Sequence, residues 1–211
     1  MRYLMLSLLA CVAVLLATSQ PVMAEDEYPV AAAEFVYCTT CHGAQLMGNS
    51  VIRAPRLSKM ETWYVERQLQ AFKDGWRGTH EGDQIGMEMQ PMAVPLSQDQ
   101  IKAAAIFATA TNSALPEHTI SANASKGRDL YATCAACHGE NGEGNQSLGG
   151  PALTGINDWY ILEQLRKYRD GSRGSHPQDS FGSQMQAAAQ ILGSDEAARD
   201  VVAYINTLRN Q

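Results

Sequence analysis

The sequence predicts an all-α protein built from two tandem domains of the same fold. Three observations predict it. The pattern Cys-x-x-Cys-His occurs twice, at Cys38–His42 and Cys134–His138. The chain matches itself when it is shifted by the 96 positions that separate these motifs. Apolar residues recur at helical spacing, and no stretch shows the period of two that marks a half-buried strand.

This pentapeptide is the attachment signature of c-type haem. Two thiols at that spacing can add to the two vinyl groups on one edge of a porphyrin, and the histidine that follows can reach the iron. A lone Cys-x-x-Cys would also suit a zinc site or a redox dithiol, but two copies that both end in histidine favour haem. We therefore predict two covalently bound haem c groups, held by Cys38 and Cys41 and by Cys134 and Cys137.

Residues 1–24 have the pattern of a signal peptide, with a basic start, an apolar run over Leu4–Ala17 and small residues before a cleavage point at Ala24. The run is shorter than the roughly 17–25 residues of a transmembrane helix, so we favour cleavage. Retention as a membrane anchor and lipidation at Cys11 are the alternatives. Cleavage would leave four cysteines, all within the haem motifs. The sequence thus predicts a periplasmic protein, anchored to the inner membrane if the leader is retained.

The formal net charge of the chain is −6 at pH 7. An acidic chain argues against nucleic acid and against an anionic membrane surface as partners. The first half is the more acidic, which either orients the protein at a partner or is ordinary solvated surface. Polar residues around Pro116 mark a linker over Asn112–Ser121. We place the two domains at residues 25–117 and 118–211.

The repeat needs no gap between the first haem motif and Met89, and its two copies indicate a tandem duplication rather than a solenoid. Each half must therefore enclose its own haem. The matched pairs include glycines, prolines and aromatic residues: Gly43 and Gly139, Gly48 and Gly144, Pro55 and Pro151, Leu57 and Leu153, Trp63-Tyr64 and Trp159-Tyr160, Gln68 and Gln164, Arg77 and Arg173, His80 and His176, Met89 and Met185.

Each half is expected to contain three helices. Thr62 is expected to cap the second helix, and Ser97 with Gln100 forms a capping-box pattern at the start of the third. Residues 43–59 and 77–95 are expected to be long loops that pack on the haem. The predicted helices span residues 30–40, 62–73 and from 97 onward in the first half, and 124–136, 158–170 and 194–208 in the second.

The second axial ligand of each iron is predicted from the repeat. Met89 and Met185 occupy matched positions, whereas Met87 and Met92 have no methionine at theirs. A second protein ligand closes the iron and favours electron transfer over the binding of small molecules. Met92 is a minor alternative in the first half. The predicted iron ligands are His42 and Met89, and His138 and Met185.

Other matched residues suggest roles around the haem. His80 and His176 allow ligation by two histidines as an alternative, although their polar, glycine-rich contexts favour the surface or the propionate region. The carbonyl groups of Pro55 and Pro151 are expected to orient the axial histidines, a plain turn being the alternative. Two further pairs remain. Arg77 and Arg173 suit haem propionates or a solvated surface, and Trp63-Tyr64 and Trp159-Tyr160 are expected to pack on haem rather than relay electrons.

With these motifs the chain resembles the dihaem cytochrome c4 family of bacterial periplasmic cytochromes. The resemblance rests on both haem motifs, Gly150–Leu153, Asp158-Trp159-Tyr160, the Asp-Gly-x-Arg-Gly segments and one methionine per half. It implies two class I cytochrome c domains related by a pseudo-twofold axis, with neighbouring haems and His/Met iron. The first half departs from the pattern at Arg53–Leu57. Its last helix also contains Ile106-Phe107-Ala108, where the second half has Val202-Ala203-Tyr204.

The resemblance further implies an electron carrier rather than an enzyme. Its partners would be the bc1 complex as donor and a terminal oxidase of the cbb3 type as acceptor. The alternative is a dihaem cytochrome subunit of a dehydrogenase, such as flavocytochrome c sulfide dehydrogenase. A dihaem peroxidase or thiosulfate dehydrogenase is disfavoured by the paired methionines and by the absence of a spare cysteine. No nucleic acid partner is expected, and membrane contact only through a retained leader.

Overall fold

The structure is a computed structural model that describes residues 33–208. The described residues belong to one compact unit that contains both halves of the repeat. Among the described residues the regular structure is helical apart from two isolated β-bridges, which confirms the all-α prediction. None of the helices within residues 33–208 combines the length and apolar character needed to cross a bilayer. The predicted leader and Cys11 lie outside the described residues.

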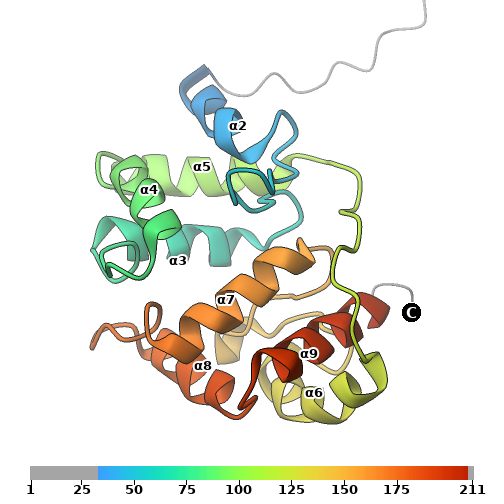
Figure 1. Ribbon diagram of the computed structural model, residues 1–211. Helices are drawn as coiled ribbons and strands as arrows, with labels where there is room; N and C mark the ends of the chain where they lie inside the picture. Colours follow the sequence, from blue (N-terminus) through green and yellow to red (C-terminus); the bar gives the residue numbers. More distant parts are fainter. Residues whose placement is uncertain (1–32, 209–211) are drawn as a thin grey trace, which may run out of the picture. The chain divides into compact units, whose positions relative to one another are not determined.

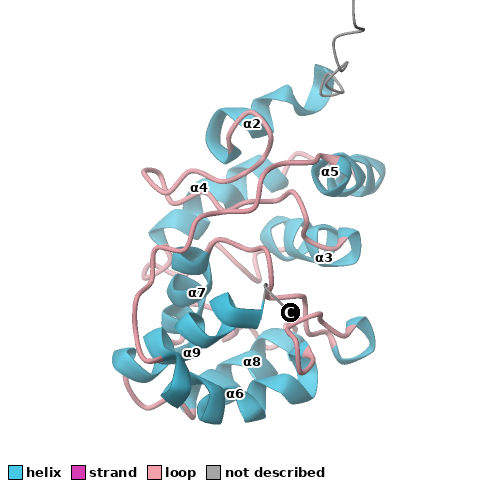
Figure 2. Ribbon diagram, turned by 90° about the vertical axis from the view of Figure 1, so that its right-hand side faces the viewer, coloured by secondary structure: helices cyan, strands magenta, loops and turns pink. Residues whose placement is uncertain are grey.

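Each half contributes four α-helices in the same order (Figures 1 and 2). In the first half α3 packs on α4 and α5. In the second half α7 packs on α8 and α9, and α6 crosses α9. The elements are η1 Ala33–Phe35, α2 Val36–His42, α3 Thr62–Lys73, α4 Gln84–Ala93 and α5 Gln98–Ala110, then α6 Ala124–His138, η2 Gln146–Leu148, α7 Asp158–Asp170, α8 Ser180–Gln190 and α9 Asp195–Leu208.

Several helix starts follow from local side chains, but that of α3 does not. Ser97 and Gln100 form the predicted capping box at the start of α5. The predicted capping role of Thr62 is wrong, because the N-cap of α3 is Glu61. Thr62 is the first helical residue, and its hydroxyl lies 2.7 Å from that of Thr109 on α5. Its side chain therefore joins two helices instead of ending one.

Residues 77–95, which the sequence predicts to be a loop, contain α4, and the matched stretch contains α8. Asp83 begins α4 by accepting a hydrogen bond from the backbone N–H of Gly86 at 2.9 Å. A Cβ at Gly86 would overlap the Asp83 carboxylate, so the glycine is required there. The prediction failed because Gly86 and Pro91, both inside α4, are residues that usually interrupt a helix. Met89 consequently lies on a helix, not in a loop.

The last helices of the two halves are displaced by one residue relative to the 96-residue register. The extra residue is Gly193, at φ +64 just before α9. Phe107 therefore matches Tyr204, and each packs on the matched aromatic residue, with ring centroids 5.8 Å apart for Phe35–Phe107 and 5.3 Å for Tyr131–Tyr204. The difference that the sequence comparison indicates at Phe107 is thus an offset. The same two positions meet in both halves, with ring planes at 25° in the first and 59° in the second.

The linker between the halves is bound at both ends. Arg56 is fully buried and donates hydrogen bonds to the carbonyl oxygens of Ser113, at 3.0 Å, and Ala114. At the other end Asp158 accepts from the backbone N–H groups of Thr119 and Ile120 at 2.6 and 2.8 Å. The departure of the first half from the repeat at Arg56 is therefore explained, because this side chain holds the linker.

Candidate functional site: two haem cavities

Two cavities, each open to solvent, contain the predicted site residues. The first is lined by Cys38, Cys41, His42 and Met89, and the second by Cys134, Cys137, His138 and Met185. All predicted haem-attachment and iron-ligating residues of a half therefore lie at one cavity. Each cavity also reaches the other half, since Tyr160 lines the first and Tyr64 lines the second as well as its own.

The cysteines are free thiols in a suitable place for haem attachment. In both motifs the second cysteine is exposed, and the first is half-buried. Burial raises the pKa of the Cys134 thiol to about 11 and raises that of Cys38 in the same direction. Two thiols beside an apolar cavity and a buried imidazole are the donor set that covalent haem c requires, so the residues fit the group.

The histidines of the two haem motifs are held by backbone carbonyl groups. Nδ1 of His42 lies 2.6 Å from the carbonyl oxygen of Pro55, and Nδ1 of His138 lies 2.6 Å from that of Pro151. A carbonyl only accepts, so Nδ1 carries the proton and Nε2 is left for a metal. Burial holds the pKa of both histidines below the ordinary value, and the carbonyl groups oppose this shift. The orienting role predicted for both prolines is confirmed.

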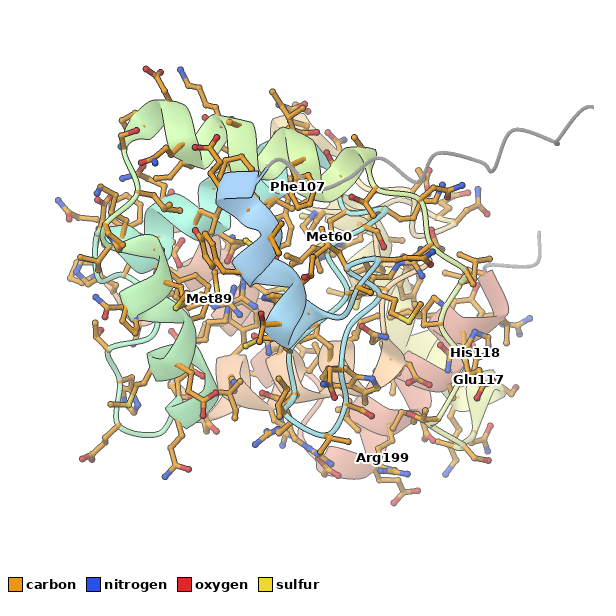
Figure 3. The ribbon with its side chains drawn as sticks, turned by 90° about the horizontal axis from the view of Figure 1, so that it is seen from above. Met60, Met89, Phe107, Glu117, His118 and Arg199 are labelled. Carbon is orange, nitrogen blue, oxygen red and sulfur yellow. The ribbon has the colours of Figure 1, made fainter. Side chains whose placement is uncertain are left out.

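Met89 and Met185 are half-buried and pack against the core from α4 and α8. Met60 and Phe107, which are labelled with Met89 in Figure 3, line the same cavity. Met92 also lines it but is 42% exposed, and Met87 does not line it. The repeat register selects Met89 and Met185, and each of them lines the cavity of its own half.

The two other matched histidines line neither cavity. His80 is exposed and accepts a hydrogen bond from the backbone N–H of Gly82 at 3.0 Å. His176 stacks on Trp76 of the first half with ring centroids 5.9 Å apart. Their positions favour His/Met over bis-histidine iron in both cavities.

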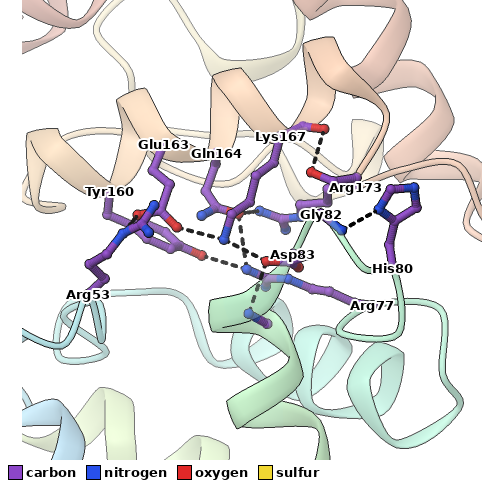
Figure 4. Close-up of polar contacts among 12 residues, drawn as sticks. Arg53, Arg77, His80, Gly82, Asp83, Tyr160, Glu163, Gln164, Lys167 and Arg173 are labelled. Atoms are coloured by element: carbon purple, nitrogen blue, oxygen red, sulfur yellow. Dashed lines mark hydrogen bonds and ion pairs between the residues drawn. The ribbon is translucent and has the colours of Figure 1, made fainter.

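Arg77 and Arg173 are buried between the halves, so their interpretation as solvated surface is wrong (Figure 4). Arg77 donates to Gln68 of its own half and to Tyr160 and Gln164 of the other, at 2.9, 3.2 and 3.1 Å. The matched contacts of Arg173 are with Gln164, Tyr64 and Gln68, at 2.6, 3.1 and 2.7 Å. Each contact has its counterpart in the other half, so the interface has approximate twofold symmetry. Each guanidinium lines the cavity of its own half.

One ionic network breaks this symmetry (Figure 4). Nζ of Lys167 lies 2.6 Å from both Asp83 and Glu163, and Glu163 lies 2.9 Å from Nε of Arg53. Burial alone would raise the pKa of Asp83, but the hydrogen bond from Lys167 and the charge of Arg77 hold it below its usual value. The residues that match Lys167, Glu163 and Arg53 in the repeat are Ala71, Arg67 and Gly149. They cannot form the network, which therefore belongs to the first cavity alone.

The openings of the two cavities also differ. The exposed lining residues of the first include Tyr37, Ile52 and Met92, whereas their matches are Thr133, Leu148 and Ala188. The same segments also expose Met47, Val51 and Met87 in the first half, against Glu143, Ser147 and Ser183 in the second. The first opening is thus the more apolar, although both halves share one fold.

The sequence did not predict the role of two residues at this interface. Glu61 of the first half accepts a hydrogen bond from the backbone N–H of Ala152 at 2.8 Å. Asn157 of the second half accepts one from the backbone N–H of Arg56 at 2.7 Å. Glu61 and Asn157 match in the repeat but differ in type, and each precedes a helix, where it would be taken for an ordinary cap. Their shared position is the only signal that could have found them.

Two covalent haem c groups in two tandem helical domains define a dihaem c-type cytochrome. The cytochrome c family model matches residues 31–107 and 124–209. The chain belongs to the dihaem cytochrome c4-type family.

Two relatives and one solved structure show the extent of the similarity. The chain is 31% identical to cytochrome c4 of Azotobacter vinelandii, over 81% of this chain and 84% of that protein. It is 32% identical to the thiosulfate dehydrogenase electron acceptor of Stutzerimonas stutzeri (strain A1501), over 75% and 73%. The structure of reduced cytochrome c4 from Pseudomonas stutzeri superposes with a TM-score of 0.65 at 26% identity, over 82% of this chain and 93% of that chain.

Proposed function

We propose that this dihaem electron-transfer cytochrome is a periplasmic carrier that takes electrons from the bc1 complex and passes them to a terminal oxidase of the cbb3 type. His42 and Met89 ligate the iron of the first haem, and His138 and Met185 that of the second. The names of the cytochrome c4 relatives support the carrier role. The route from bc1 complex to oxidase comes from the family resemblance.

The observation that carries the proposal is the pairing of one histidine with one methionine at each cavity. When bound, each haem supplies an iron that gains and loses one electron. The chain's part is to fill both axial positions, so that no small molecule reaches the metal, and to keep the surroundings apolar. The carbonyl groups of Pro55 and Pro151 orient the imidazole rings. Such a closed site favours electron transfer over catalysis.

The different openings of the cavities support a carrier that serves two kinds of partner. The apolar opening of the first half suits a partner with an uncharged contact face. The second opening, with Glu143 nearby, suits one whose contact depends on charge. Raising the salt concentration should slow electron exchange through the second half and leave exchange through the first nearly unchanged, since charged contacts are screened.

The route is tested by isolating the protein from its native membranes after mild cross-linking and identifying the redox enzymes that are joined to it. We expect the bc1 complex and the oxidase, together with oxidation of the reduced cytochrome by that oxidase in stopped-flow measurements. Cross-links to a dehydrogenase alone, and no oxidation by the oxidase, would rule the route out. The N-terminal sequence of the same preparation tests the cleavage after Ala24, and its membrane or soluble fraction tests the location.

A second candidate is an electron acceptor of a periplasmic dehydrogenase. It is favoured by the relative from Stutzerimonas stutzeri, whose name makes it the electron acceptor of thiosulfate dehydrogenase. The two functions are separated by the donor. Rapid reduction by a dehydrogenase with its substrate, and none by the bc1 complex with quinol, would favour the acceptor role.

A further inference from the structure

The peptide bond that follows Pro55 is hydrogen-bonded at both ends. Its carbonyl oxygen lies 2.6 Å from Nδ1 of His42. Its N–H, which belongs to Arg56, donates to Oδ1 of Asn157 in the other half at 2.7 Å. One planar peptide group therefore connects the proposed iron ligand of the first half to a side chain of the second.

The matched peptide bond in the second half makes the same pair of contacts. The carbonyl oxygen of Pro151 lies 2.6 Å from Nδ1 of His138. The N–H of Ala152 donates to Oε1 of Glu61 in the first half at 2.8 Å. We call each chain of imidazole, peptide group and side chain from the other half a relay. The relays cross between the halves in opposite directions.

Both relays are closely packed at their far ends. Asn157 is buried, and its Nδ2 donates to the carbonyl oxygen of Met47 at 3.4 Å, which directs Oδ1 to Arg56. A Cβ at Gly48 would lie 2.5 Å from Oδ1 of Asn157, and one at Gly144 would lie 2.8 Å from Oε1 of Glu61. Glycine is needed at both positions to let the other half approach. Neither Glu61 nor Asn157 caps its own helix with its side chain, although each occupies the N-cap position.

The relays end in different groups, because Asn157 is a neutral amide and Glu61 is an acid. A hydrogen bond to a carboxylate is roughly twice as strong as one between neutral groups, and hydrogen bonds in a chain polarise one another. The Ala152 N–H bond to Glu61 therefore makes the Pro151 carbonyl a better acceptor. That carbonyl draws the Nδ1 proton of His138 more strongly and makes the ligating nitrogen more electron-rich.

We propose that Glu61 and Asn157 are positioning residues that set the reduction potentials of the two haems apart through these relays. A more electron-rich histidine stabilises ferric iron, so Glu61 lowers the potential of the second haem, whereas Asn157 leaves that of the first higher. The proposal deepens the proposed function and rests on ligation by His42 and His138. Each half thereby supplies the residue that sets the reduction potential of the haem in the other half.

The test exchanges amide and carboxylate in place, in the full dihaem protein. Glu61→Gln should raise the potential of the second haem and leave the first unchanged. Asn157→Asp should lower the potential of the first haem and leave the second unchanged. Potentials are measured by spectroelectrochemical titration at pH 7 and pH 9, so that the new carboxyl group is ionised in at least one series. NMR assigns each potential to its haem.

Two further measurements separate the relays from simple charge or packing effects. In the reduced protein the amide proton of Ala152 should move upfield in Glu61→Gln, and that of Arg56 should move downfield in Asn157→Asp. Glu66→Gln, on the same helix as Glu61, removes an equal charge away from the relay and should leave the potential of the second haem nearly unchanged. A shift equal to that of Glu61→Gln would overturn the proposal.

Unchanged potentials in both variants would also overturn it, as would equal shifts at both haems. A merely structural role would lower stability without selecting one haem. Failure of the proposed ligation is recognised separately, because the unsubstituted protein would then show a high-spin iron. A low-spin spectrum with unchanged potentials counts against the relays alone.

Discussion

The ammonium group of Lys167 lies 2.6 Å from Oδ1 of Asp83, and this ion pair joins α7 of the second half to the start of α4 in the first. Asp83 is wholly shielded from solvent, and the Lys167 side chain is 9% exposed. Removing two charges from water is costly, so such a pair contributes more to the choice of one arrangement than to net stability. Because Asp83 also caps α4, the pair connects the docking of the halves to the helix that carries Met89.

Replacement of Lys167 by methionine should destabilise the protein by about 3 kcal/mol, because it removes the ion-pair partner of the buried Asp83 carboxylate, whereas Glu163 keeps its ion pair with Arg53. The free energy of unfolding is measured by urea denaturation followed by circular dichroism. Lys126→Met is the matched control. Its partner Glu196 lies 3.7 Å away, both side chains are largely exposed, and almost no change is expected. Equal effects of the two substitutions would contradict the prediction.

The same ion pair predicts a pH dependence. The pKa of Asp83 is held below its ordinary value of about 3.9, so the stability that its carboxylate contributes is fully present above about pH 4. That stability is lost as the pH falls through the still lower pKa of the folded state. The difference in unfolding free energy between the unsubstituted protein and Lys167→Met should therefore shrink between pH 5 and pH 2.5. A difference that stays constant over that range would assign the effect to packing instead.

The methionine ligands make a spectroscopic prediction. Met89→Ala and Met185→Ala should each remove about half of the ferric methionine–iron charge-transfer absorption and lower the potential of one haem, because the thioether favours ferrous iron. Met92→Ala, at the same cavity as Met89, is the control and should retain the full absorption. Loss of about half of the absorption in Met92→Ala, with none in Met89→Ala, would transfer the ligation in the first half to Met92.

Local signals predicted much of this fold. The capping box at Ser97 and the bounds of α3 depend on neighbours in the sequence. The repeat alone aligned Met89 with Met185. The predictions failed where residues that are distant in the sequence determine the local structure. Helix α4 was missed because it contains Gly86 and Pro91, and its cap, Asp83, is buried in an ion pair with Lys167 of the other half. Glu61 and Asn157 resemble helix caps until the other half is present, since each accepts a hydrogen bond that only the interface supplies.

The crossing of α6 and α9 depends on the absence of a side chain at Gly127. A Cβ there would overlap the backbone carbonyl of Asp200 and crowd Tyr204. Gly127→Ala should therefore destabilise the protein by about 1–3 kcal/mol, although alanine is the better helix former. Ser125→Ala on the same helix is exposed and should change the unfolding midpoint very little. A Gly127→Ala protein that is more stable than the unsubstituted one would show that α6 can shift away from α9 without loss.

The linker should loosen when Asp158 is replaced by asparagine. Its carboxylate accepts hydrogen bonds from the N–H and hydroxyl of Thr119, from the N–H of Ile120 and from the side-chain amide of Asn206, at 2.6 to 3.0 Å. An amide in its place would direct an N–H group at these donors, which costs about 2 kcal/mol for a buried site.

Because the four donors also hold the pKa of Asp158 below its usual value despite burial, the stability that Asp158 contributes is lost only under strongly acidic conditions. Compared with the unsubstituted protein, Asp158→Asn should be less stable at neutral pH, and this difference should shrink as the pH falls below about 4. Limited proteolysis at pH 7 should cut the variant between Ala114 and Ser121 faster than the unsubstituted protein and release two coloured halves. Asp129→Asn, an exposed substitution on α6, is the control. Equal cutting of both variants would show that Asp158 does not hold the linker.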